Sequence, residues 1–315
     1  MAKYIVLRLV TAVAVLIGVS IVTFLLLHII ASSPGAAALG QQATPQAIAA
    51  YNKANGYDDP LQVQYVHYLG NLLHGNLGYS YKLNQSVNAL IAENAPRTLY
   101  LTGVSLVLSI LISIPIGMYQ AVRRNTIGDY AATAGSFTLY SMPSFFLGLL
   151  LIQAFALSLH VFPAEASQST SVIGVILDPR GMILPIVTFT AVNVAGFSRY
   201  MRSSTIDNLA QEYVRTAKAK GLSERQVLWR HLLKNSSLPL ITLIGLSIPR
   251  LLAGNLLIET LFNYPGLGLL FYNALGNEDY NVLLAYILIG AVLTVLGNLI
   301  ADIAVAAVDP RVRVT

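Results

Sequence analysis

The sequence predicts an all-α, polytopic membrane protein with six membrane-spanning helices. Hydrophobic residues make up 55% of the 315 residues and charged residues only 10%, whereas about a quarter of a typical soluble domain is charged. Apolar runs of roughly 20 residues recur along the chain, and a helix of that length crosses a hydrocarbon core of about 30 Å. The basic residues are concentrated in alternate polar segments, which is typical of a membrane topology.

The composition also excludes several kinds of site. The chain contains no cysteine, which rules out disulfides, zinc–thiolate centres and catalytic thiols and leaves the redox compartment open. Its formal net charge of +5 comes from loops that flank the apolar runs. This charge therefore indicates topology and no nucleic-acid-binding face.

The first span is predicted over residues 9–30, and residues 1–31 form the first unit of the chain. A cleaved signal peptide is the alternative, because Lys3 and Arg8 precede the run and small residues follow it. The apolar run is longer than the roughly 7 to 15 residues of a signal-peptide core, which favours a retained helix.

Residues 32–98 are predicted to form an extracytoplasmic segment, on the side opposite Lys3. A short surface helix is expected over residues 62–73, and the glycines of the run His-Gly-Asn-Leu-Gly-Tyr-Ser at 74–80 favour a tight turn. His67 and His74 could be proposed as metal ligands. No third histidine or carboxylate stands close to them in the sequence, so solvated surface histidines are favoured.

Residues 99–315 are predicted to form a five-helix core, with spans over 99–122, 130–159, 181–197, 238–261 and 282–301. Pro143 removes a backbone hydrogen bond in the third span and predicts a kink there. Before the last span, residues 259–281 are expected on the same side as 32–98. That stretch combines a Pro265-Gly266 turn with a short helix against the membrane surface.

Six spans place both termini on one side of the membrane, and the basic residues indicate which side it is. Fourteen Lys and Arg lie in the termini, the loop after the second span and the polar loop 199–239. Four lie in the opposite segments (Lys53, Lys82, Arg97 and Arg180), and Arg250 lies within a span. Because positive charge is enriched on the inner side, both termini are predicted to be cytoplasmic.

The loop 199–239, called the basic hairpin below, has the pattern of two ordered helices. A first helix is expected from apolar residues at helical spacing: Ile206, Leu209, Ala210, Tyr213, Val214 and Ala217. Gly221 is suited to end it, and Ser223 with Gln226 predicts a capping box that starts the second helix. Eight Lys and Arg against three acidic residues keep this loop out of lipid. A hairpin that lies on the membrane surface without a partner is the alternative.

Several stretches resemble one transporter family. Residues 212–222, Glu-Tyr-Val-Arg-Thr-Ala-Lys-Ala-Lys-Gly-Leu, and the later Leu238-Pro239 are similar to the coupling loop of ABC importer permeases. The dipeptide and oligopeptide branch is indicated by residues 215–221, by His231-x-x-x-Asn235, and by Glu-Thr-Leu-Phe-Asn-Tyr-Pro-Gly-Leu-Gly at 259–268. The run at 74–80 also resembles that branch, although Asn76 replaces an expected Asp and weakens any acidic role there. Arg215 stands where the wider family has Glu, and Leu238-Pro239 come about five residues late, as is usual for the peptide branch.

The resemblance implies the fold of a type I ABC importer permease in the bacterial inner membrane. It implies a role as the permease subunit of an ATP-driven importer of dipeptides or oligopeptides, with nickel or glutathione import as the alternative. The implied partners are a second permease, homologous or identical, two ATP-binding subunits and an extracytoplasmic substrate-binding protein. ATP and Mg would be bound by those partner subunits, and no cofactor or metal is expected on this chain.

The resemblance also assigns residues to contacts. ATPase coupling is expected from Glu212, Arg215, Thr216, Ala217, Lys218, Gly221 and Leu222. Docking of the binding protein is expected from Tyr79, Tyr264, Pro265 and Gly266, because they lie in the two long outer segments, which carry aromatic residues between polar ones. Two hypotheses concern Arg250: it lines the translocation cavity and attracts a substrate carboxylate, or it is a structural arginine bonded to backbone that Pro249 frees or to an acid of the other permease.

Catalytic motifs are missing from the sequence. It has no phosphate-binding Gly-x-x-x-x-Gly-Lys-[Ser/Thr] loop, no His-Glu-x-x-His and no Gly-x-Ser-x-Gly. We therefore expect a transport subunit with no catalytic residues and with ATP hydrolysis on other subunits. A gradient-driven secondary transporter is the alternative from another class. Such proteins usually carry several ionisable residues within their spans, whereas only Arg250 is central here.

Overall fold

The computed structural model describes residues 2–30, 34–39, 43–253 and 256–308. In chain order its elements are α1 (Ala2–Ile30), α2 (Pro34–Leu39), α3 (Pro45–Ala54), α4 (Leu61–Leu73), β1 (Tyr79–Ser80), β2 (Gln85–Ser86), α5 (Val87–Val122), α6 (Ile127–Ser141), α7 (Ser144–Leu151), the π-helix η1 (Ile152–Ser158), α8 (Val172–Leu177), α9 (Pro179–Leu209), α10 (Glu212–Ala219), α11 (Glu224–Gln226), the π-helix η2 (Val227–Leu232), α12 (Leu233–Ser236), α13 (Leu238–Ala253), α14 (Leu256–Leu261), α15 (Leu267–Gly276) and α16 (Tyr280–Val308). The predicted all-helical class is confirmed.

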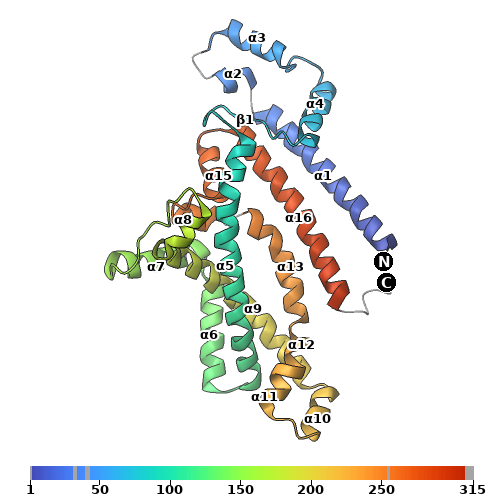
Figure 1. Cartoon of the computed structure of the whole chain (residues 1–315), viewed down its shortest axis with the longest axis vertical. Coiled ribbons are helices and arrows are strands. Elements are labelled where there is room, and N and C mark those ends of the chain that lie inside the picture. The colour runs from blue at the N-terminus through green and yellow to red at the C-terminus, as the bar shows by residue number, and fades with distance from the viewer. Residues whose placement is uncertain (1, 31–33, 40–42, 254–255, 309–315) are drawn as a thin grey trace.

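The long helices run along one axis, and the two predicted polar regions lie at opposite ends of it (Figure 1). Helices α2 to α4 lie at one end, whereas α10 to α12 lie at the other. This separation agrees with the expectation that residues 32–98 and the basic hairpin leave the membrane on different sides.

Three described helices are long and apolar enough to cross a membrane: α5, α9 and residues Tyr280–Leu299 of α16. The broken pair α6 and α7 with η1 provides a fourth candidate if it counts as one span, and α1 contains the shorter apolar stretch Val10–Leu26. The number of six spans stays a prediction. Exposed aliphatic side chains along α1, such as Val13 and Ile17, suit contact with lipid.

The most extensive helix pair is α5 with α9. Small residues line this interface, so the two backbones approach closely, as is common between helices in membranes. A Cβ atom on Gly117 of α5 would lie 2.7 Å from the Ser198 carbonyl and 2.6 Å from the Met201 Cβ of α9. The Ser109 hydroxyl donates to the Ser105 carbonyl of its own helix at 2.6 Å and approaches the Thr190 carbonyl of α9 at 3.3 Å. Helices α13 and α16 form a second close pair, and α1 packs against α16.

Within the predicted segment 32–98, the described residues form α2 to α4, a two-stranded sheet and the start of α5. Helix α4 confirms the expected surface helix, and Gly75 and Gly78 have φ values of +75° and +96° in the expected tight turn. Strands β1 and β2 pair antiparallel, with Tyr79 opposite Ser86. The Ser86 hydroxyl then accepts a bond from the Ala89 amide and starts α5, so the second long helix begins twelve residues earlier than the predicted span at 99.

The third predicted span is broken more sharply than a kink. Helix α6 ends at Ser141, α7 begins at Ser144, and the two are bent by 106° across Met142 and Pro143. The proline ring cannot continue the preceding helix, and here Pro143 occupies the N-cap of α7 instead. The bend sends α7 sideways out of the bundle (Figure 1).

The topology can be tested with cysteines, because the natural chain has none. Lys82, after β1, and Asn277, after α15, are exposed at one end, and Lys218 of α10 is exposed at the other. We expect cysteines at positions 82 and 277 to react with an impermeant maleimide in intact cells. A cysteine at position 218 should react only after the membrane is permeabilised. Labelling of position 218 in intact cells would contradict the predicted orientation.

Candidate functional sites at the two ends of the molecule

A compact turn forms the tip of the basic hairpin. Helix α10 ends at Ala219, and Gly221 has a φ of +80°, a left-handed conformation that glycine adopts without strain. The Gly221 amide donates to the Lys218 carbonyl at 2.9 Å, and the Leu222 amide donates to the Ala217 carbonyl at 3.3 Å. This is the bond pattern of a Schellman helix end. The prediction that Gly221 terminates the helix is confirmed.

The second helix of the hairpin starts as its sequence predicts. The Ser223 hydroxyl accepts from the Gln226 amide at 3.4 Å, and the Ser223 amide donates to Oε1 of Gln226 at 3.0 Å. These reciprocal bonds form a capping box. The helix then passes through the π-helix η2 before continuing into α12 and α13.

The first helix differs from its prediction. Sequence periodicity indicates one helix through Ile206 and Ala217, whereas α9 ends at Leu209 and α10 begins at Glu212. The reason is the cluster beneath the tip, which contains Val214, Ala217, Val227 and Leu232 as buried residues and Leu209, Tyr213, Leu222 and Leu228 at its edge. A straight helix would carry Val214 away from Val227. The break folds α10 across η2 and buries this apolar face.

The predicted coupling residues divide into exposed and supporting groups. Glu212, Arg215, Thr216, Lys218 and Gly221 are exposed, whereas Ala217 is buried and Leu222 is half-buried. Arg215 and Glu212 form an ion pair at 3.0 Å, with side chains 72% and 83% exposed. The exposed set faces solvent in this chain, and Ala217 and Leu222 hold the tip together from below.

Helix α9, which carries the first residues of the basic hairpin, is fixed to α6 by two contacts. Arg202 donates from Nε and Nη2 to the two carboxylate oxygens of Asp129, both at 3.0 Å. The Arg202 guanidinium holds the pKa of the Asp129 carboxyl below its usual value, and the Asn125 amide and Thr133 hydroxyl also donate to that carboxyl. One turn away, the Arg199 guanidinium lies 4.5 Å from the centre of the Phe137 ring of α6.

At the opposite end, a buried carboxylate joins three helices. Glu259 of α14 is fully buried and accepts bonds from the Thr98 hydroxyl of α5 at 2.8 Å and the Gly268 amide of α15 at 2.6 Å. Thr98 in turn accepts from the Leu267 amide at 2.8 Å. We call Glu259, Thr98, Gly266 and Gly268 the Glu259 clamp. It satisfies the free amides at the start of α15.

Three of the predicted docking residues lie within the Glu259 clamp or beside it in the sequence: Tyr264, Pro265 and Gly266. Tyr264 is fully buried, and its hydroxyl donates to the Arg97 carbonyl at 2.8 Å. Gly266 is buried against Glu259 and Thr98, and Pro265 is half-buried. In this chain the signature closes the ends of three helices, and docking of the binding protein at Tyr264 and Gly266 stays a prediction. Sequence analysis did not single out Glu259 or Thr98; the available signal was an acidic residue five positions before an aromatic one, Tyr264.

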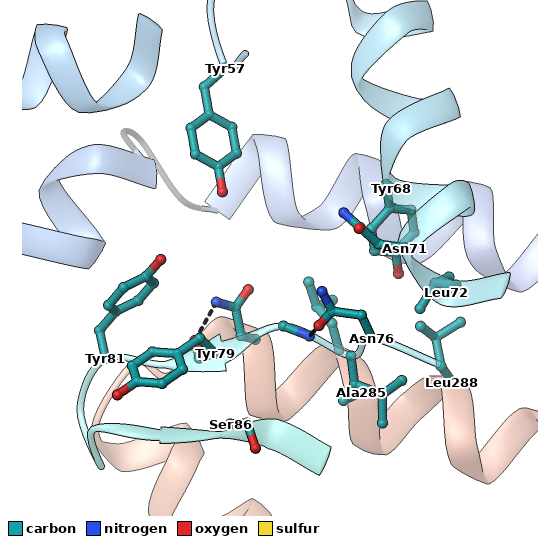
Figure 2. Close-up of a pocket in the computed structure, with 14 residues that line it drawn as sticks. Tyr57, Tyr68, Asn71, Leu72, Asn76, Tyr79, Tyr81, Ser86, Ala285 and Leu288 are labelled. Carbon is teal, nitrogen blue, oxygen red and sulfur yellow. Dashed lines mark hydrogen bonds between the residues drawn. The ribbon is translucent and has the colours of Figure 1, made fainter. Parts of the chain in front are cut away.

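Tyr79 is the one predicted docking residue that is exposed, with 37% of the residue accessible. Its carbonyl accepts from the Asn281 side-chain amide of α16 at 2.8 Å (Figure 2), and its hydroxyl donates to Asn84 at 2.7 Å.

The Arg250 side chain lies outside the described part of the structure, so both hypotheses for it stay predictions. Among the described residues, no group of three His, Asp or Glu lies close enough to hold a metal ion.

Comparison with known proteins places the chain among transport permeases. Residues 113–314 match the family profile described as binding-protein-dependent transport system inner membrane component, and residues 1–102 match the corresponding N-terminal profile. The oligopeptide transport system permease protein AppB of Bacillus subtilis is 38% identical over 315 residues, which cover 99% of this chain and all of that protein. A probable peptide ABC transporter permease protein of Sinorhizobium fredii is 36% identical over 99% of this chain and all of its own length.

Two further relatives bear on cargo and fold. The glutathione transport system permease protein GsiC of Salmonella typhimurium is 34% identical over 99% of both chains. Among solved structures, a chain of the methionine ABC transporter MetNI in an inward-facing conformation matches with a TM-score of 0.50. That match covers 70% of this chain and 96% of the other at 19% identity, so it supports the fold alone.

Proposed function

Since this chain belongs to the family of inner-membrane components of binding-protein-dependent transport systems and has the type I ABC importer permease fold, we propose that it is the permease subunit of an ATP-driven peptide importer. Relatives named as oligopeptide and peptide permeases over nearly the full length support this cargo. Glutathione, itself a short peptide, is the second candidate, because the GsiC permeases align over the same length.

The tip of the basic hairpin carries the proposal. It is a rigid, exposed knob, held by the Gly221 turn, the capping box and an apolar cluster below it. Such a knob suits insertion into a groove of an ATP-binding subunit. Arg215, Lys218 and Lys220 on its surface favour a partner with an acidic rim.

The connection from the knob to the membrane supports a lever mechanism. Closure of two ATP-binding subunits would move α10, and the tightly packed hairpin would pass the motion to α9 as one body. The Asp129–Arg202 pair and the Arg199–Phe137 contact tie α9 to α6. A push on the knob would therefore move both helices and open the pore toward the binding protein. A second permease, two ATPases and the binding protein complete the proposed complex.

Gly221→Trp should impair docking of the hairpin tip to an ATP-binding subunit while the permease still folds. A Cβ at position 221 meets nothing within 4 Å, so the chain has room for a larger side chain, although the φ of +80° strains any residue but glycine or asparagine. Gly221→Asn is the matched control, because asparagine tolerates this conformation and stays small. We expect the Trp variant to lose at least about tenfold in peptide uptake by proteoliposomes, equivalent to roughly 1.4 kcal/mol of coupling. The Asn variant should keep most of the activity.

The measurement includes co-purification of the ATP-binding subunits. A Trp variant that assembled in full amount and transported at the wild-type rate would contradict insertion of this turn into the ATPase.

A further inference from the structure

A cavity of about 260 Å³ lies where α5, α6 and α9 meet, and we call it the α6–α9 cavity. Its charged lining residues all belong to α9: Arg199, Arg202 and Asp207. Arg202 is neutralised by the buried carboxylate of Asp129. Arg199 and Asp207 are exposed, and neither takes part in an ion pair within the described residues. The cavity therefore offers one unmatched positive charge and one unmatched negative charge.

The guanidinium of Arg199 lies on two aromatic rings of α6. Its carbon is 4.5 Å from the centroid of the Phe137 ring and 4.7 Å from that of Tyr140. These rings stand seven and ten positions inside the predicted span 130–159, about 10 Å or more from its inner end at 1.5 Å per residue. An arginine at such a depth normally faces protein or a water-filled cavity, because exposing its charge to lipid is costly. This favours a position inside the assembled transporter over contact with lipid.

Stacking on the rings leaves the donors of Arg199 available. The rings contact the face of the guanidinium, whereas its five N–H groups point outward in its plane. Within the described chain no carboxylate pairs with them. A ligand carboxylate suits this planar fork, which can bind both of its oxygens at once. Because the rings hold the fork in place, little side-chain freedom is lost when a carboxylate binds.

Asp207 lies on the same ridge of α9 as Arg199. The two are eight positions apart, with the exposed Ser203 midway between them, so their Cα atoms are about 12 Å apart. Two ion contacts of up to about 4 Å each and a dipeptide of at most about 7 Å bridge a distance of this order. A zwitterion neutralises both charges, whereas a lone anion from a lipid or a neighbouring subunit would leave Asp207 unmatched.

We propose that the α6–α9 cavity binds a dipeptide by its two charged ends, with the carboxylate on Arg199 and the ammonium facing Asp207. Arg199 then selects cargo with a free carboxylate, and the spacing to Asp207 selects short cargo. In a longer peptide that binds Arg199, an extended chain carries the ammonium past Asp207. The inference rests on the proposed function for the class of ligand, and it adds the residues that recognise it.

The test measures binding to the purified complex in lipid nanodiscs, without nucleotide and without the binding protein. The probe is the photoreactive dipeptide alanyl-benzoylphenylalanine, used with both ends free, as its C-terminal amide and as its N-acetyl form. We expect saturable labelling by the free form that mass spectrometry maps to lining residues such as Phe137 or Ile206. The amide should bind at least about tenfold more weakly, the typical loss of a hydrogen bond to a charged group.

Variants then assign each end of the probe. Arg199→Gln should bind the free and amide probes equally, whereas Arg199→Lys keeps the charge and should retain most of the preference for the free form. Asp207→Asn should lose the preference for a free over an acetylated amine and keep the preference for a carboxylate. Arg180→Gln, exposed at the outer end of the same helix, is the matched control and should bind as wild type.

Equal binding of the free and amide probes to the wild-type complex would overturn the proposal without any variant, as would the absence of saturable labelling at the cavity. An Arg199→Gln complex that keeps the wild-type preference would also contradict it. Loss of the second permease from that variant, with equal binding of both probes to the wild type, would instead assign Arg199 to an ion pair between the two permeases. ATP-driven peptide uptake by the wild-type complex tests the proposed function separately, because this binding needs neither ATP nor the binding protein.

Discussion

Gly266→Ala is expected to disrupt folding of the permease, although it adds a single methyl group. The φ of Gly266 is −117°, so alanine meets no conformational strain. The obstacle is steric, because its Cβ would lie 2.5 Å from the Thr98 hydroxyl and closer still to a Glu259 carboxylate oxygen. Neither neighbour can retreat without giving up its bond to an amide of α15. Overpacking of about 1–3 kcal/mol therefore adds to broken buried hydrogen bonds of about 1–3 kcal/mol each.

Gly276→Ala is the matched control, since it lies at the end of the same helix with nothing within 4 Å of the added atom. Thermal unfolding of the purified protein in detergent should show a large loss for Gly266→Ala and almost none for Gly276→Ala. Glu259→Leu should be as severe as Gly266→Ala, because it leaves the Thr98 hydroxyl and the Gly268 amide without their acceptor. Wild-type stability in Gly266→Ala would show that the Glu259 clamp does not hold these helices together.

Asp129→Asn is expected to weaken both stability and transport. Asp129 is 2% exposed and Arg202 28% exposed, so the substitution leaves a largely buried guanidinium without its counter-ion. Removing one partner of a buried pair costs about 3–5 kcal/mol, and the partial exposure of Arg202 places this case at or below the lower end. Because Arg202 lies on α9 near the start of the basic hairpin and ties it to α6, uptake should fall together with stability.

The exposed pair of Glu212 and Arg215 supplies the control for stability. Glu212→Gln should change the free energy of unfolding by no more than about 0.5 kcal/mol. An effect of Asp129→Asn no larger than that of Glu212→Gln would contradict a structural role for the pair. A double-mutant cycle with Arg202→Ala isolates the interaction between the two side chains.

The same pair predicts a pH dependence. The pKa of Asp129 is lowered in the folded protein, chiefly by Arg202. The stability that the Asp129–Arg202 pair contributes is therefore complete above the ordinary carboxyl pKa of about 4. It is lost as the pH falls through the lower pKa of Asp129 in the folded protein. The stability difference between wild type and Asp129→Asn should be full at neutral pH and should shrink below about pH 4.

Local features of the basic hairpin could be predicted because their partners are close in sequence. The Gly221 turn joins residues three and five positions apart, and the capping box joins Ser223 to Gln226. The apolar periodicity wrongly predicted one continuous helix across Gln211. The chain breaks there because the break buries Val214 against Val227. The sequence predicted the position of the bend at Pro143. It did not predict the angle, because the angle depends on what α7 packs against.

The sequence by itself determined that this protein is helical and built for a membrane, and it located the hairpin and the peptide-permease signatures. Composition, helical spacing and capping residues act over a few turns, so they can be inferred without a fold. Only the tertiary structure decided what the signature at 259–268 does. Glu259 and Thr98 stand 161 positions apart, and Asp129 and Arg202 stand 73 apart. No local pattern encodes which of the buried polar groups will meet.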